Sequence, residues 1–138
     1  VTCADLIQRE YPLDKIWNFL EQQETFDGDI VTNPPYGLAQ ESVEKALEMI
    51  PKGRKVVMYL KLTFLEGKKR RKLFDTNQLK NVYVLTQRSN CAKNGDEELF
   101  GAGAVAYAWF EWEKGANCKP LITWINGDEN PEKWSFME

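Results

Sequence analysis

Four consecutive residues, Asn33-Pro34-Pro35-Tyr36, carry the groups in this chain that are best suited to chemistry. The Asn33 side-chain oxygen and the Pro34 backbone carbonyl are hydrogen-bond acceptors that could take both protons of one amino group. An amine on a planar ring is a poor nucleophile because its lone pair is delocalised into the ring. Two such acceptors would free the lone pair and stabilise the positive charge that develops, so no general base is needed.

The remaining two residues of the motif would hold a planar substrate against these acceptors. Tandem prolines fix φ and have no N–H donor, so the turn presents its carbonyls rigidly. Tyr36 offers a ring face on which a flipped-out base could stack. The alternative is a strand-ending turn with an aromatic plug. A predicted strand before the motif and a predicted amphipathic helix after it favour the chemical interpretation.

The composition excludes several other kinds of site. The chain contains no histidine, which removes the commonest metal ligand and the commonest general base at neutral pH. A hydrolase triad with a histidine base is therefore excluded, and we expect no metal. The three cysteines lack CxxC spacing and predict free thiols. The net charge of −3 argues against nucleic-acid binding over the whole surface, although Lys68 to Lys72 form a local basic patch.

Length and hydropathy predict one globular unit. We expect residues 1–138 to form a single domain, since a chain of this length can build a hydrophobic core. A content of 43% hydrophobic and 28% charged residues is typical of soluble proteins. The longest apolar stretches, such as Val56 to Leu60, are too short to span a bilayer and have no signal-peptide flanks. We therefore expect a cytoplasmic protein without membrane contact.

The elements around the motif predict an α/β fold. Asp29 to Thr32 is predicted as a short buried strand, and the prolines that follow end its pairing. The motif would then lie at the carboxyl end of a strand, where open α/β sheets bind their ligands. Beyond Gly37, apolar residues at helical spacing predict a helix that Pro51 and Gly53 close.

Strands and helices continue to alternate along the chain. Lys55 to Leu62 is predicted as a second buried strand, Glu66 to Phe74 as a basic helix and Val82 to Leu85 as a third strand, the pattern of a βαβ sheet. Two late strands, Ala104 to Trp112 and Leu121 to Ile125, follow without a helix between them. They predict an antiparallel edge on a mostly parallel sheet. Their tryptophans are more typical of a core than of stacking platforms.

Three further segments allow less specific predictions. Val1 to Asp5 predicts a strand edge that ends in an acid. Pro12 to Gln23 fits a helix, although Ile16-Trp17 could equally be a short strand. Gln87 to Gly103 is polar and longer than most loops of compact domains, which is typical of functional or disordered segments.

The motif and its surroundings resemble phage- and prophage-type adenine-specific (N6) DNA methyltransferases. The resemblance runs from Asp27 to Trp112, and the matching stretches are Val43 to Leu47, Lys61 to Gly67 and Ala106 to Phe110. It implies a Rossmann-like α/β sheet with helices on both faces, S-adenosylmethionine as the cofactor and DNA as the partner. The catalytic residues would be Asn33, Pro34, Pro35 and Tyr36, with Tyr36 stacking the flipped adenine.

The resemblance also implies which residues would hold the cofactor. In this family the acid that ends the second strand binds the ribose, and Asp5 is the matching position. Asn18 stands where the family pattern suggests an acid that bonds the cofactor's amino group, and Asn33 would contact the cofactor from the motif. No glycine-rich loop and first strand precede Asp5. We therefore expect an N-terminally truncated domain with weakened or lost cofactor binding, whose exposed sheet edges could pair between copies.

Several alternatives stay open at this point. The basic patch could contact DNA phosphates or be a solvated helix face, and Phe64 and Glu66 could line the base pocket or serve as core or cap residues. The same tetrapeptide serves enzymes that methylate RNA bases or a protein glutamine. A third alternative is a catalytically silent module that binds DNA or a partner. The candidate phosphate ligands are Lys68, Lys69, Arg70 and Arg71.

Overall fold

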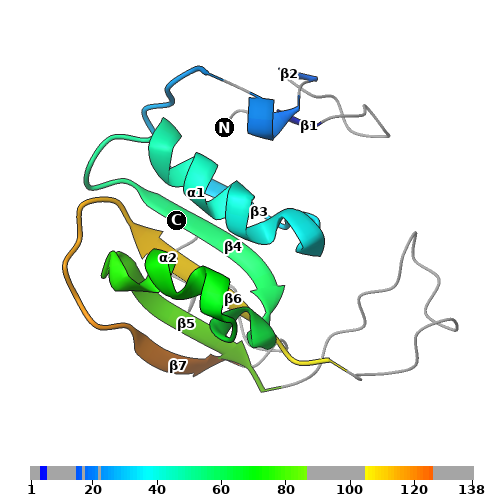
Figure 1. Ribbon diagram of the computed structural model, residues 1–138, viewed down its shortest axis with the longest axis vertical. Helices are drawn as coiled ribbons and strands as arrows, with labels where there is room; N and C mark the ends of the chain where they lie inside the picture. The colour runs from blue at the N-terminus through cyan, green and yellow to red at the C-terminus, as the bar shows by residue number, and fades with distance from the viewer. Residues whose placement is uncertain (1–3, 6–14, 17, 22, 87–104, 126–138) are drawn as a thin grey trace, which may run out of the picture.

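The chain forms a five-stranded sheet and a separate pair of short strands (Figure 1). The structure is a computed structural model, and it describes residues 4–5, 15–16, 18–21, 23–86 and 105–125. The larger sheet has the order β3-β4-β6-β5-β7, and the smaller one pairs β1 with β2. The strands are β1 (Ala4–Asp5), β2 (Lys15–Ile16), β3 (Ile30–Thr32), β4 (Lys55–Lys61), β5 (Leu79–Leu85), β6 (Tyr107–Glu113) and β7 (Leu121–Ile125).

Four of the five strands in the larger sheet run in one direction. β3 is parallel to β4 and β7 is parallel to β5, whereas β6 is antiparallel to both of its neighbours, β4 and β5. The predicted α/β class is confirmed, and the sheet is mixed, with two parallel and two antiparallel strand pairs. The prediction that the two late strands form an antiparallel edge is wrong, because β6 lies inside the sheet and β7 is an edge strand parallel to β5.

The pattern of side chains along β6 explains its interior position. Phe110 and Trp112 are fully buried on one face, and Glu111 is buried on the other, so this strand needs cover on both faces and partners on both edges. The connection from β6 to β7 crosses the start of β5, where the Cys118 N–H donates to the Asn77 carbonyl at 3.0 Å. Because of this crossing, β7 pairs with the edge of β5 that faces away from β6.

Both described α-helices pack against the same face of the sheet (Figure 1). α1 (Ala39–Met49) joins β3 to β4, and α2 (Arg71–Asp75) joins β4 to β5. The two crossovers move across the sheet in the same direction, and right-handed crossovers then place both helices on one side. Helices were expected on both faces of the sheet. In the described residues, the α-helices cover one face only.

Four short 3-10 helices complete the described elements. They are η1 (Phe19–Glu21), η2 (Tyr36–Leu38), η3 (Leu62–Leu65) and η4 (Lys68–Arg70). η4 continues directly into α2, which together make the basic helix predicted from the sequence. α1 matches its predicted apolar face and ends before Pro51, where the Lys114 ammonium donates to the Ile50 carbonyl at 2.7 Å. A cation at this position complements the negative end of the helix dipole.

The hydrophobic core lies between the two helices and the sheet. Alternate residues of β4 (Val56, Met58 and Leu60) face it and are buried, as a strand period of two requires. Phe64 on η3 is 0% exposed and meets the rings of Phe74, Phe110 and Trp112 edge-on, with centroids 5.9, 5.6 and 6.1 Å away. Phe64 is thus a core residue.

Two residues that were predicted to be buried, in β7 and in β3, are exposed because these strands lie at the edges of the described sheet. Trp112 is a core residue as expected, but Trp124 is 67% exposed because β7 has a strand neighbour on one side only among the described residues. Trp109 is half-buried, with its ring 5.0 Å from that of Tyr59. The strand around Ile30 was expected to be buried. Val31 in β3 is 49% exposed because β3 is also an edge strand in the described sheet.

A polar network occupies the face of the sheet opposite the helices. Its centre is the Glu111 carboxylate, which is 2% exposed. It pairs with the Lys55 ammonium at 3.1 Å and accepts hydrogen bonds from the Asn81 amide at 2.7 Å and the Tyr83 hydroxyl at 3.3 Å. A buried carboxylate with three partners has the compensation that its desolvation demands.

This network predicts that stability depends on alkaline pH through Tyr83. Burial raises the pKa of Tyr83 to about 12, and the nearby Glu111 carboxylate adds to the shift. Because the folded state favours the neutral phenol, the stabilisation is complete below the ordinary tyrosine pKa of about 10 and is lost as pH rises through about 12. Tyr83→Phe should flatten this part of the profile of unfolding free energy against pH. A profile that keeps its slope in the variant would contradict the assignment.

The N-terminal predictions are met in part. Asp5 ends β1, as expected, and β2 covers Ile16, which decides for a strand at the position that was left open between helix and strand. η1 then supplies a single helical turn. The long polar segment from Gln87 to Gly103 and the cysteines Cys3 and Cys91 lie outside the described residues. None of the helices in the described part of the chain is long and apolar enough to cross a membrane.

Candidate functional site

The tetrapeptide lies at the carboxyl end of β3, as predicted. β3 and β4 are parallel and in register, with Thr32 beside Met58. The residues that follow Thr32 therefore lie at the same end of the sheet as the last residues of β4. Parallel strands of α/β sheets present their ligands at this end. The fold thus brings Asn33 beside Tyr59, at the end of β4 that also carries Lys61.

The backbone of the motif leaves the Pro34 carbonyl available. Pro35 has φ −55° and ψ 131°, and its carbonyl accepts the Leu38 N–H at 3.0 Å, which closes η2. Within the described ranges, no backbone N–H donates to the Pro34 carbonyl and no hydrogen bond engages the Asn33 amide. Asn33 is exposed and Pro34 is half-buried. Two neighbouring acceptors therefore remain open to a ligand.

Contacts from the end of β4 and from η3 fix the ring of Tyr36. Its hydroxyl lies 3.1 Å from the Thr63 hydroxyl, and either oxygen could be the donor. The Lys61 ammonium lies 4.4 Å from the ring centroid. The Tyr36 side chain is 38% exposed, so it is held at two points while part of its surface still faces solvent.

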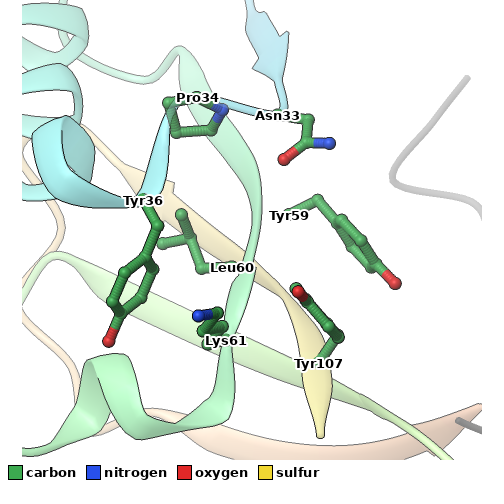
Figure 2. Close-up of a pocket in the computed structure, with 7 residues that line it drawn as sticks. All are labelled: Asn33, Pro34, Tyr36, Tyr59, Leu60, Lys61 and Tyr107. Carbon is green, nitrogen blue, oxygen red and sulfur yellow. The ribbon is translucent and has the colours of Figure 1, made fainter. Parts of the chain in front are cut away.

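These residues line one pocket of about 170 Å³ (Figure 2). Its far wall is a stacked pair of tyrosines, Tyr59 and Tyr107, with centroids 5.0 Å apart and ring planes 10° from parallel. In Figure 2 the side chains of Tyr36 and this pair stand on opposite sides, with Lys61 between them. The lining residues are Asn33, Pro34, Tyr36, Tyr59, Leu60, Lys61 and Tyr107.

Four of the lining residues were not predicted as site residues, namely Tyr59, Leu60, Lys61 and Tyr107. Tyr107 is brought in by β6, because this strand pairs with β4 and sets Tyr107 opposite Lys61. Tyr59 and Lys61 share one face of β4 by the strand period of two. That alternation is readable in the sequence, but the pairing of β4 with β6 is not.

In the basic patch, two arginines are engaged in contacts within the protein and two lysines are exposed. The Arg70 guanidinium donates to the Glu66 carbonyl at 2.7 Å and stacks 4.7 Å above the Phe64 ring, so Arg70 ties η4 to the core. Arg71 pairs with Asp75 at 2.8 Å across one helical turn. Lys68 and Lys69 are exposed. They remain the predicted phosphate ligands of the patch, and Glu66 caps η3 at its C-terminal end.

Of the three predicted cofactor contacts, Asp5, Asn18 and Asn33, the pocket includes only Asn33. Asp5 is the last residue of β1, which pairs in parallel with β2 outside the larger sheet. The Asn18 side-chain oxygen accepts the Leu20 N–H at 3.2 Å. Within the described ranges, no three Cys, Asp or Glu residues gather in a way that could hold a metal ion.

Comparison with known proteins gives structural likeness only. No protein-family model matches the chain, and no curated protein matches it either. One similar solved structure is a predicted O-methyltransferase from Agrobacterium tumefaciens, with a TM-score of 0.48 and 11% sequence identity. The alignment covers 74% of this chain and 45% of that protein.

Two further similar structures are those of M1.HpyAVI and of its complex with SAM. The first has a TM-score of 0.40 and 13% identity over 86% of this chain and 66% of the other. The complex has a TM-score of 0.40 and 15% identity over 81% of this chain and 62% of the other. This chain thus spans between 45% and 66% of the length of these three structures. The strand order and directions, rather than these likenesses, establish the α/β class.

Proposed function

We propose that this chain carries the target-base site of an S-adenosylmethionine-dependent methyltransferase that acts on adenine N6 in DNA. The observation that carries the proposal is the pair of open acceptors at the end of β3, the Asn33 amide oxygen and the Pro34 carbonyl, beside the anchored ring of Tyr36. An adenine amino group has two protons, and the motif offers two acceptors for them.

The acceptors would act on the nucleophile. When the Asn33 oxygen and the Pro34 carbonyl hold the amino protons, the nitrogen becomes more tetrahedral and its lone pair turns away from the ring. The same oxygens stabilise the positive charge that grows on the nitrogen during methylation. The methyl group would pass from sulfur to nitrogen as the C–S bond breaks, and the methylated nitrogen would then release one proton to solvent. Because the pocket orients the amine rather than deprotonating it, the absence of histidine from the whole chain is compatible with this chemistry.

S-adenosylmethionine, when bound, supplies an electrophilic methyl group on a sulfonium. Asn33 fits a place between cofactor and base, since its amide lines the pocket and carries both a donor and an acceptor. Asp5 would bind the ribose from the end of β1. Asn18 would reach the cofactor's amino group, with part of its hydrogen-bonding capacity already used by Leu20.

Tyr36 would hold the base in the pocket by stacking. Stacking of a base on an aromatic side chain contributes about 1–3 kcal/mol, which exceeds the ~0.5–1 kcal/mol of an exposed cation–π contact such as that of Lys61. Thr63 restrains the ring through its hydroxyl, so less side-chain entropy is lost on binding. The exposed Lys68 and Lys69 on η4 favour a nucleic acid over a protein glutamine as the substrate.

Methyl transfer to duplex DNA tests the proposal. The chain is incubated with DNA and methyl-labelled S-adenosylmethionine, and the DNA is then digested to nucleosides. We expect the label in N6-methyldeoxyadenosine. Label on RNA bases or on a protein glutamine instead, when these are offered in competition, would contradict the proposed substrate.

A second candidate is a non-catalytic module that binds DNA or a partner. The open edge of β3 favours it, because Ile30–Thr32 pairs only with β4 in the described sheet, and a strand of a second copy or of another chain could pair there. Calorimetric titration with S-adenosylmethionine separates the two. Binding heat is expected for the enzyme, and no detectable heat at a millimolar cofactor concentration would favour the module.

A further inference from the structure

The ring that is proposed to receive the base is already covered by a cation. The Lys61 ammonium lies 4.4 Å from the Tyr36 ring centroid, and Figure 2 shows it reaching toward that ring from between Tyr36 and Tyr107. Lys61 is the last residue of β4 and lines the pocket. A base that stacks on this side of Tyr36 therefore has to displace the ammonium.

No other group in the pocket can neutralise the displaced charge. The residues that line the pocket with Lys61 are asparagine, proline, leucine and tyrosines, and none of them carries a carboxylate. Lys61 also makes no ion pair within the described ranges. The described pocket thus offers this ammonium no anionic partner, and a bound nucleotide would bring one.

Resting on the function proposed above, we propose that Lys61 binds a phosphate of the nucleotide whose base stacks on Tyr36. The base takes the place of the ammonium on the ring, because base stacking outweighs an exposed cation–π contact. The flexible four-carbon stem of lysine lets the ammonium move away from the ring without moving β4. Every nucleotide carries a phosphate beside its base, whereas a glutamine side chain does not. Lys61 would thus select the substrate class.

The salt dependence of binding to single-stranded DNA tests this role. A single strand is the suitable probe because its bases are already unpaired and can enter the pocket. For a mixed-sequence oligodeoxynucleotide, Lys61→Met should reduce the slope of log affinity against log salt by about 0.7, the change expected when one phosphate on a single strand is no longer neutralised. Lys61→Arg keeps the charge and should keep the slope.

Two further variants separate Lys61 from general electrostatics and from stacking. Lys52→Met removes an exposed lysine just before the opposite end of β4, roughly 20 Å away by strand length, and should leave the slope unchanged. Tyr36→Ala should weaken binding with little change of slope, because it removes stacking and no charge.

The outcomes distinguish this role from the function on which it rests. An unchanged slope in Lys61→Met, with Tyr36→Ala still weakening binding, would overturn the phosphate contact and leave the base site standing. No binding of the oligonucleotide by the wild type, or no effect of Tyr36→Ala, would overturn the proposed function and the inference together.

Discussion

Asn33→Ala is expected to lower the rate of methyl transfer to adenine by about 10²–10³-fold. A loss of this size is typical when an enzyme loses one hydrogen-bonding group that stabilises the charge of the transition state. The side chain is exposed at the pocket and makes no hydrogen bond within the described ranges that would be broken. The loss should therefore arise in the reaction and leave the fold intact. Single-turnover rates at saturating DNA, together with unfolding curves of both proteins, measure the two effects.

The matched control for this variant is Asn33→Asp. A carboxylate keeps an oxygen acceptor in the same position, so it should retain part of the rate that alanine loses. The Pro34 carbonyl is untouched in both variants, which limits the loss to one of the two acceptors. A rate for Asn33→Ala close to that of the wild type would remove Asn33 from the reaction.

Phe64→Ala should reduce the free energy of unfolding by about 3–5 kcal/mol, as expected when a fully buried phenylalanine is truncated. Phe64 is 0% exposed and contacts three aromatic rings from the helices and the sheet. The guanidinium of Arg70 stacks on the Phe64 ring and donates to the Glu66 carbonyl, and these contacts hold η4 against η3. The truncation therefore leaves a cavity where α2 and β6 meet η3.

Urea denaturation of the two proteins measures this change as a shift of the midpoint. Phe64→Leu should lose much less, because it keeps most of the buried volume. Since Thr63 precedes Phe64 and holds the Tyr36 hydroxyl, the alanine variant should also loosen the site before global unfolding. A midpoint equal to that of the wild type would show that the ring cluster contributes little.

Local features of the site were predictable because local chemistry sets them. Asn33 and Tyr36 lie where the sequence placed them, since two prolines end a strand whatever surrounds it. α1 was predictable from its apolar spacing and from Pro51. β4 also matched, because it has its own continuous apolar run, whereas β5 includes the predicted Val82 to Leu85 but begins earlier, at Leu79.

Long-range pairing could not be predicted in the same way. The position of β6 depends on which strands it pairs with, and nothing within residues 107–113 specifies β4 and β5 as neighbours. Tyr107 therefore enters the pocket without a signal of its own. Arg70 was grouped with Lys68 and Lys69 because sequence alone does not show that its guanidinium lies over Phe64.

The most direct test of the proposed site is recognition of the adenine amino group itself. Two oligothymidylates are compared, one with a single central adenine and the other with a central purine that lacks the 6-amino group. The wild type should bind the adenine strand roughly tenfold more tightly, the size expected for two hydrogen bonds of about 0.5–1.5 kcal/mol each. Asn33→Ala should lose most of this preference. Equal affinities in the wild type, or a preference that survives in Asn33→Ala, would contradict the amino-group site.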